Sequence, residues 1–230
     1  MAYAISLWTP PALAVAGSSD LFPVRRIFCV GRNYAEHPKE MGGDGREQPF
    51  FFIKSAGALV PGGGEVHYPP KTSNYHYETE LVVAIAKSGR RIEAKRAHDH
   101  VFGYAVGLDM TRRDLQQLGK DHGRPWDFGK DFDEAAPCSA LVPAAKIGHP
   151  SKGAIWLTVN GKERQRADLG DMIWSVPEQI AYLSEYYSLE PGDLIYSGTP
   201  AGVGPVKPGD ELHAGIDKVG ELKVKIVAAL

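Results

Sequence analysis

The stretch Tyr77-Glu78-Thr79-Glu80-Leu81-Val82-Val83-Ala84-Ile85-Ala86 places two acids directly before a run of apolar residues. The apolar run predicts a β-strand. Side chains alternate in direction along a strand, so the side chains of Glu78 and Glu80 point to one face of the sheet and that of Thr79 points to the other. At a partly buried strand end the two negative charges repel each other. Proteins relieve such repulsion by protonating one acid or by placing a cation between the two.

A second apolar run, residues 101–108, ends on Asp109 in the same manner. Three carboxylates at strand ends predict a site for a hard cation, because Mg²⁺, Mn²⁺ and Ca²⁺ prefer ligands that are all oxygen. Zinc would prefer His and Cys ligands, which are missing from these positions. The alternative is that the acids are merely solvated, which is the usual state of an isolated Glu-x-Glu pair.

The length and charge of the chain limit the classes of protein to which it belongs. Its 230 residues suit one large domain or a domain with a small N-terminal appendage. A Pro-interrupted leader meets a strand-like segment near Phe22-Pro23, so we expect residues 1–22 to pack as a leader on a domain formed by residues 23–230. A net charge of −2 without a basic stripe argues against nucleic acid as a partner.

Neither a membrane span nor a disulfide is expected. No apolar run approaches the roughly 20 residues needed to cross a bilayer, which predicts a soluble protein. The two cysteines, Cys29 and Cys138, form neither a metal-ligand pattern nor a disulfide framework. They predict free thiols and a reducing, cytoplasmic location.

Glycine and proline, which favour turns, are frequent, with 26 and 17 residues. Their frequency predicts many short elements joined by turns and hence an α+β, β-rich fold. Residues 155–159, followed by Asn160-Gly161 and a polar segment, predict a two-residue β-hairpin. Further strands are expected at residues 24–30, 194–196 and 222–227.

Helices are expected to be fewer. One begins at the capping box Ser175-Val176-Pro177-Glu178, carries Ile180, Leu183 and Tyr187 on one apolar stripe, and is ended by residues 189–193. Another runs from Thr111, its expected N-cap, towards Leu118, with Leu115 and Leu118 facing the core.

The second of these helices carries a cation and an amide on one face. Arg113 and Gln116 are three residues apart, which makes them neighbours on a helix surface. Beside the expected metal they would bind a substrate carboxylate or carbonyl. The alternative is that Arg113 pairs with acids on a solvated helix.

The segment from Gly31 to Glu40 follows a predicted strand, and a short helix is expected to open at Pro38. His37 and Glu40 are three residues apart, close enough for the carboxylate to orient the imidazole as a general base requires. The alternative is a solvated histidine in a loop. The glycines of residues 41–45 would allow this helix to move as a lid.

A glycine-rich segment, residues 198–204, follows a predicted strand, and its backbone is expected to bind an anion or a carboxylate. Three common signatures are missing from the sequence: the P-loop, HExxH and GxSxG. Their absence argues against P-loop nucleotide-binding proteins, zincins and nucleophile-elbow hydrolases.

In their order along the chain, these motifs resemble the fumarylacetoacetate hydrolase family from Val24 onward. The matching motifs are Gly31-Arg32-Asn33-Tyr34 with His37 and Glu40, Tyr77 to Leu81, Gly103-Tyr104 through Asp109, Arg113-Asp114 with Gln116, Trp126 with Lys130 and Asp133, Val159-Asn160-Gly161 with Gln165, and Pro191-Gly192-Asp193 through Gly204. The resemblance implies a mixed β-sandwich roll with a few short helices, usually dimeric. It also implies Mg²⁺ or a similar ion held by Glu78, Glu80 and Asp109, with Lys130 and Thr199 lining the site.

The resemblance further implies a hydrolase acting on carbon–carbon bonds in ketonic substances, and the residues suit a 3-acylpyruvate. The carboxylate and the neighbouring oxo group of such a substrate would chelate the metal. His37, held by Glu40, is then the expected base, and Lys130 would stabilise the oxyanion. Arg113 and Thr199 are the candidates for binding the two ends of the substrate.

We favour fumarylpyruvate, an intermediate of gentisate-type aromatic catabolism, because the compact length and the Met110 to Leu115 motif resemble that subgroup. One departure from the family pattern lies at Pro137-Cys138-Ser139, a segment expected to shape the pocket. Decarboxylation or tautomerisation of oxaloacetate, or hydrolysis of fumarylacetoacetate, are the alternatives within the family. The first two need no water activated by His37. An alternative from another class is a non-catalytic module in which the acids hold a structural Ca²⁺.

Overall fold

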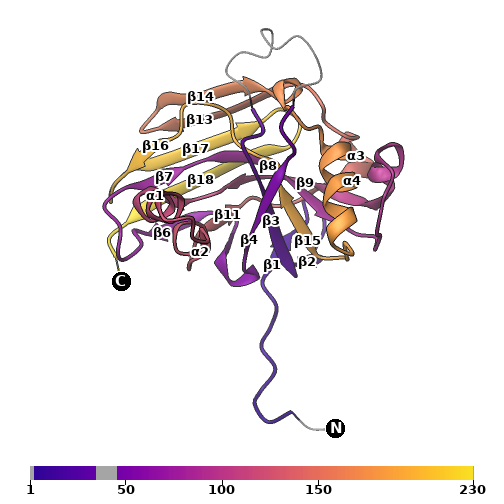
Figure 1. Ribbon diagram of the computed structural model, residues 1–230, viewed down its shortest axis with the longest axis horizontal. Helices are drawn as coiled ribbons and strands as arrows, with labels where there is room; N and C mark the ends of the chain where they lie inside the picture. Colours follow the sequence, from indigo (N-terminus) through magenta and orange to yellow (C-terminus); the bar gives the residue numbers. More distant parts are fainter. Residues whose placement is uncertain (1–2, 35–45, 230) are drawn as a thin grey trace.

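The computed structural model describes residues 3–34 and 46–229, and strands dominate it (Figure 1). The strands are β1 (Ala12–Ala14), β2 (Leu21–Pro23), β3 (Arg26–Gly31), β4 (Phe50–Lys54), β5 (Leu59–Pro61), β6 (Gly64–His67), β7 (Tyr75–Tyr77), β8 (Thr79–Ile85), β9 (Val101–Leu108), β10 (Thr111–Arg112), β11 (Ala136–Cys138), β12 (Val142–Pro143), β13 (Ala154–Val159), β14 (Lys162–Asp168), β15 (Asp193–Tyr196), β16 (Gly204–Val206), β17 (Glu211–Ile216) and β18 (Gly220–Val227). The helices are α1 (Arg113–Asp121), α2 (Asp127–Lys130), α3 (Ala144–Ile147), α4 (Val176–Tyr186) and the 3₁₀ helices η1 (Ala56–Ala58), η2 (Ala94–His100) and η3 (Leu169–Asp171). The expected α+β, β-rich fold is confirmed.

Two large mixed sheets form the body of the molecule. One has the strand order β4-β3-β15-β8-β9-β11-β5, with β12 paired to β9, and the other has the order β14-β13-β17-β18-β6. Parallel and antiparallel pairs occur in both, since β15 runs parallel to β3 and β18 parallel to β6. Apolar side chains of both sheets share one core, which makes the pair a sandwich. Two smaller sheets, β10-β7-β16 and β1-β2, complete the arrangement.

β8 is buried along its whole length, which explains its continuous apolar sequence. Leu81, Val83 and Ile85 join the core between the large sheets. Val82 and Ala84 point the other way, into a second core. The acids at the start of the strand therefore lie where the packed interior gives way to an open site.

The N-terminal segment covers this second core. β1 pairs antiparallel with β2, and Leu13, Val15 and Phe22 are buried there. Residues 3–10 are exposed and run away from the body in Figure 1. The division of the chain into a leader of residues 1–22 and a domain of residues 23–230 stays a proposal.

The predicted hairpin and the predicted capping box are confirmed. β13 and β14 are joined by Asn160 and Gly161, whose φ angles are +52° and +75°, as a type I′ turn requires. Ser175 is the N-cap of α4, and its side chain and backbone complete a capping box with Glu178.

The other helix differs from the prediction. α1 begins at Arg113 rather than at a Thr111 cap, because Thr111 belongs to β10 and its hydroxyl donates to the backbone oxygen of Asp109. The expectation that Leu118 faces the core is wrong, since its side chain is 50% exposed. Gln116 and Gly119 are buried instead. A Cβ on Gly119 would lie 3.0 Å from the carbonyl oxygen of Pro125, so close packing selects a small residue there.

Both cysteines are free, as expected, and the structure shows that both are buried. Within residues 3–34 and 46–229, the helices are all too short or too polar to cross a membrane.

Candidate active site

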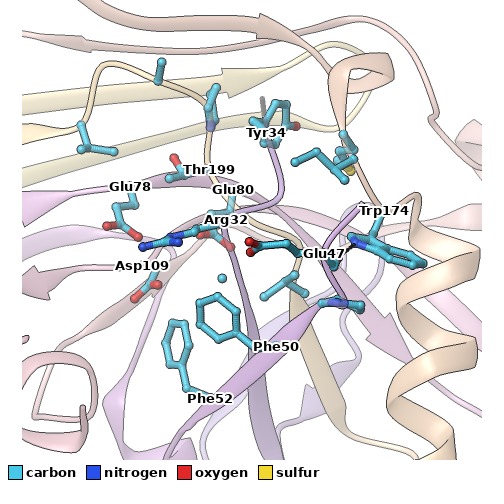
Figure 2. Close-up of a pocket in the computed structure, with 18 of the residues that line it drawn as sticks. Arg32, Tyr34, Glu47, Phe50, Phe52, Glu78, Glu80, Asp109, Trp174 and Thr199 are labelled. Carbon is cyan, nitrogen blue, oxygen red and sulfur yellow. Dashed lines mark hydrogen bonds between the residues drawn. The ribbon is translucent and has the colours of Figure 1, made fainter. Parts of the chain in front are cut away.

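A cavity of about 1040 Å³ opens at the acidic end of β8 (Figure 2). Its wall is built from the ends of β3, β4 and β8, from one face of α1, and from the segments around Trp174 and Thr199. Glu78, Glu80 and Asp109 all line it. The interior of the sandwich thus ends in a polar chamber large enough for an organic acid.

These three acids, the acid triad, converge as the sequence predicts. One oxygen of each lies within 4.8 Å of the others, and all three residues are buried. The pairing of β8 with β9 produces this geometry, because Thr79 lies opposite Leu108 and the strand ends coincide. Oxygens bound to one ion at the usual 2.0–2.6 Å lie at most about 5 Å apart, so the triad fits a hard divalent cation.

Glu80 has a different environment from its two partners. Its Oε2 accepts a hydrogen bond of 2.8 Å from the backbone N–H of Gly198. Burial raises the pKa of Glu80 well above its ordinary value, and the neighbouring charges of Asp109 and Glu78 raise it further. The glycine-rich segment expected to bind an anion therefore binds a carboxylate of the chain itself. A positive charge in the cavity would favour ionised Glu80.

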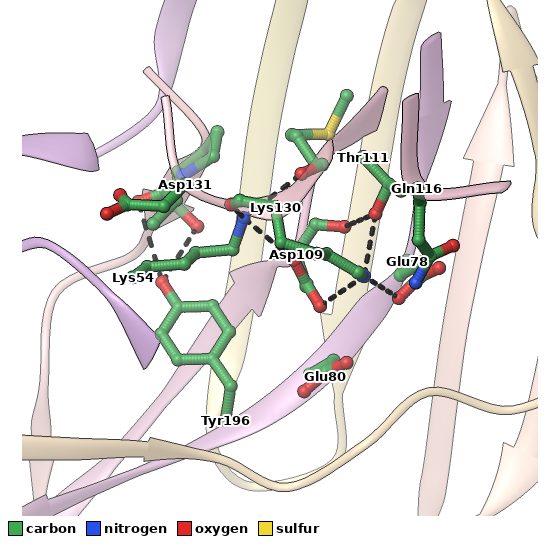
Figure 3. Close-up of polar contacts among 12 residues, drawn as sticks. Lys54, Glu78, Glu80, Asp109, Thr111, Gln116, Lys130, Asp131 and Tyr196 are labelled. Atoms are coloured by element: carbon green, nitrogen blue, oxygen red, sulfur yellow. Dashed lines mark hydrogen bonds and ion pairs between the residues drawn. The ribbon is translucent and has the colours of Figure 1, made fainter. Parts of the chain in front are cut away.

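Lys130 lies between Asp109 and Glu78, two of the three acids of the triad (Figure 3). Its ammonium group donates to Glu78 Oε2 at 2.8 Å, Asp109 Oδ2 at 2.6 Å and Thr111 Oγ1 at 2.7 Å. These three contacts use all three of its hydrogens. Burial opposes the charged ammonium group, but Asp109 and Glu78 outweigh it and raise the pKa of Lys130 above its ordinary value. Its expected role as an oxyanion donor stays a prediction and requires it to release one of these partners.

A second lysine, Lys54, was missed by sequence reasoning. It is fully buried at the end of β4, with its ammonium group 2.9 Å from Asp109 Oδ1 and 3.0 Å from the carbonyl oxygen of Met110 (Figure 3). It also contacts the carbonyl oxygen of Lys130. Burial alone would raise the pKa of Asp109, but Lys130 and Lys54 together lower it. A lone lysine after the run Phe50-Phe51-Phe52-Ile53 was the only sequence signal for this residue.

Arg113 and Gln116 share a helix face, as predicted. Arg113 Nη1 donates to Gln116 Oε1 at 2.7 Å, and its Nη2 forms an ion pair with Glu78 Oε1. Both residues line the cavity. The guanidinium of Arg113 is thus already paired with the triad, and substrate binding by Arg113 and Gln116 stays a prediction.

Thr199 lines the cavity, and Gln165 holds it in place. Gln165 Nε2 donates to Thr199 Oγ1 at 2.9 Å and to the carbonyl oxygen of Pro200 at 2.8 Å. Gln165 Oε1 accepts from the backbone N–H of Thr79 at 3.0 Å. One buried amide therefore ties the loop of Thr199 to the strand that carries Glu80.

The expected base pair, His37 and Glu40, lies outside the described residues. Their proposed catalytic role therefore rests on the sequence. Tyr34 is the last described residue before them, and it lines the cavity.

The fold and site define a metal-binding enzyme built on a mixed β-sandwich, and comparison with known proteins agrees. The model of the family described as fumarylacetoacetate (FAA) hydrolase C-terminal matches residues 26–227. The chain therefore belongs to the fumarylacetoacetate hydrolase family.

The chain is also similar to individual members of this family. The chain is 51% identical to a fumarylpyruvate hydrolase from Ralstonia sp. over 180 residues, which is 78% of this chain and 93% of the relative. It is 46% identical to a mitochondrial oxaloacetate tautomerase from Mus musculus over 202 residues, which is 88% of this chain and 91% of the relative. A crystal structure of fumarylpyruvate hydrolase from Pseudomonas aeruginosa, in complex with Mn²⁺ and pyruvate, superposes with a TM-score of 0.93 at 51% identity and covers 99% of this chain and 100% of that chain.

Proposed function

We propose that this protein is a metal-dependent hydrolase that cleaves the carbon–carbon bond of a 3-acylpyruvate, with fumarylpyruvate as substrate and fumarate and pyruvate as products. The observation that carries the proposal is the buried acid triad at the wall of a cavity of about 1040 Å³. Support comes from the 51% identity to a fumarylpyruvate hydrolase and from the similar structure that holds Mn²⁺ and pyruvate.

The acid triad is proposed to hold Mg²⁺ or Mn²⁺. A divalent cation at this position would supply Lewis-acid polarisation of the 2-oxo acid end of the substrate. The protein would contribute a fixed set of ligands. Lys54 and Lys130 hold the carboxylate of Asp109, and the N–H of Gly198 holds that of Glu80, so these oxygens reorganise little.

Water would be activated by His37, oriented by Glu40. The water oxygen forms a bond to the acyl carbonyl carbon, and the bond between this carbon and C3 of the pyruvate unit breaks. The electron pair of that bond goes to C3, which takes up a proton to give pyruvate. The acyl fragment leaves as the carboxylic acid.

Oxaloacetate tautomerisation is a second candidate, favoured by the 46% identity to a tautomerase. It needs the triad but no attacking water. Fumarylpyruvate hydrolysis is preferred because the identity to a fumarylpyruvate hydrolase, 51%, is higher.

We also propose a cytoplasmic homodimer. The two reduced, buried cysteines suit a reducing compartment, and the family resemblance implies the dimer. Light scattering of the purified protein measures the oligomeric state directly.

The proposed reaction is tested by incubating the purified protein with fumarylpyruvate and Mg²⁺ and quantifying both products by chromatography. We expect fumarate and pyruvate in equal amounts, no products after treatment with EDTA, and recovery when Mg²⁺ or Mn²⁺ is added back. If no fumarate forms with either metal, the proposal is wrong.

A further inference from the structure

The cations that line the cavity fall into two groups. Lys130 and Arg113 form ion pairs with the acid triad, and Arg46 pairs with Glu178 at the rim. Arg32 and Lys120 also line the cavity, but neither forms an ion pair with an acid in the described part of the chain. Arg32 and Lys120 are thus the lining cations available to an anionic ligand, while Glu47 and Asp171 are the lining acids outside the triad.

The chain holds Arg32 in a constrained position. Its backbone is left-handed, with φ at +53°, which is uncommon for a residue with a side chain. The next residue, the buried Asn33, locks this conformation. Its side chain donates to the carbonyl oxygens of Ser197 at 2.7 Å and Trp174 at 2.9 Å and accepts from the Trp174 N–H at 2.7 Å. Backbone strain of this kind is found where a functional side chain must be aimed, and Figure 2 shows Arg32 among the side chains that line the cavity.

Lys120 lies on the same face of α1 as Arg113, seven residues further on. Seven residues are two helical turns, or about 10 Å along the axis. Its ammonium group lies 4.9 Å from the ring centre of Trp126. Burial lowers the pKa of Lys120, and the neighbouring charges of Arg113 and Arg32 lower it further. Unlike Arg113, Lys120 thus stands in a group of cations without an acid partner of its own.

The spacing along α1 matches the length of the proposed substrate. Arg113 lies at the metal end of the cavity, where it pairs with Glu78. In an extended seven-carbon diacid, six carbon–carbon bonds separate the two carboxylate carbons by roughly 8 Å. A substrate chelated at the triad therefore reaches the level of Lys120 with its far end. Glu47 also lines the cavity but forms no ion pair with either cation within the described residues.

We propose that Arg32 and Lys120 bind the carboxylate at the acyl end of the substrate and so select dicarboxylic acylpyruvates. This inference rests on the proposed function. It departs from the expectation that Arg113 binds this end, because Arg113 is already paired with Glu78 and Gln116.

The test uses the Mg²⁺-loaded full-length enzyme and the variants Lys120→Met and Arg32→Met, which keep an unbranched apolar side chain but remove the charge. Lys120→Arg restores the charge, and Lys95→Met removes a lysine that is 78% exposed on the surface. Inhibition constants are measured for the two product fragments, fumarate and pyruvate. The values of kcat/KM are measured for fumarylpyruvate and for acetylpyruvate, which lacks the far carboxylate.

We expect both Met variants to weaken fumarate inhibition and to lower kcat/KM for fumarylpyruvate by about tenfold or more. Pyruvate inhibition and acetylpyruvate turnover should change less than about twofold, a split that a merely structural role does not produce. Lys120→Arg should recover most of the loss, and Lys95→Met should behave as wild type. Equal losses for both substrates, or unchanged fumarate inhibition, would overturn this assignment while leaving the proposed hydrolase intact. A wild-type enzyme that releases no fumarate would overturn both.

Discussion

The ammonium group of Lys54 lies 2.9 Å from Asp109 Oδ1, and both side chains are almost completely buried, at 0% and 1% exposure. The two residues are 55 positions apart, on β4 and directly after β9. With Lys130 on the other oxygen, Asp109 is held on both sides by positive charge. The site is therefore organised before any ligand arrives, and its charges depend on one another.

Replacing Lys54 by Met should destabilise the protein strongly. The substitution leaves Asp109 with one cation fewer in the interior, and breaking a buried ion pair typically costs about 3–5 kcal/mol. Urea unfolding in EDTA measures the free energy of unfolding. Lys95→Met, at an exposed position, serves as the matched control. A loss below about 1 kcal/mol for Lys54→Met would show that the pair does not stabilise the fold.

Replacing Glu80 by Gln should weaken Mg²⁺ and Mn²⁺ binding by about tenfold or more, because the triad loses one charged ligand. The Gln side-chain oxygen can still accept the N–H of Gly198, so the fold should persist. Calorimetric titration with the metal gives the affinity, and Glu65→Gln, at an exposed position, is the control. Unchanged affinity would place the metal elsewhere.

The predicted pair His37 and Glu40 should act in turnover and not in metal binding. His37→Ala and Glu40→Gln are each expected to lower kcat for fumarylpyruvate by about 10²-fold, the usual size of a general-base effect. Metal affinity, measured by calorimetry, should stay at the wild-type value. Turnover at the wild-type rate in both variants would remove the pair from the mechanism.

The capping box of α4 should make stability depend on pH. Burial opposes ionisation of Glu178, but hydrogen bonds from the hydroxyl and N–H of Ser175, with Arg46, lower its pKa. A lowered pKa in the folded state adds stability above the ordinary pKa of about 4.3, and this stability is lost as pH falls through the lowered value.

Glu178→Gln is therefore expected to lower the free energy of unfolding by about 1 kcal/mol at pH 7, with a smaller difference at pH 4 and below. Urea unfolding at a series of pH values measures the free energy of unfolding of wild type and variant. Glu185→Gln, on the exposed face of α4, is the control. A difference that does not vary with pH would contradict the assignment.

The acid triad was predictable because it follows from local pattern. Alternation along a strand puts Glu78 and Glu80 on one face, and Asp109 ends the next buried run. The antiparallel register of β8 and β9, which brings the two strand ends together, was not predicted from the sequence.

Lys54 and the buried face of α1 were not predictable in the same way. Lys54 depends on a partner far away in the sequence, and nothing near it marks it as buried. In α1, the apolar spacing of Leu115 and Leu118 suggested the wrong face. The face was decided by close contact with the segment before α2, which favours a small residue at position 119 and leaves Leu118 outside.

The central claim, that this site hydrolyses a long acylpyruvate and does not merely enolise a short oxo acid, is tested most directly by one ratio. The values of kcat/KM for fumarylpyruvate and oxaloacetate are measured with the same Mg²⁺-loaded preparation, following released fumarate for the first and loss of the enol form and released pyruvate for the second. We predict that fumarylpyruvate exceeds oxaloacetate by at least about tenfold, because only the longer substrate reaches both ends of the cavity. A higher kcat/KM for oxaloacetate would contradict this account and favour the tautomerase or decarboxylase alternative.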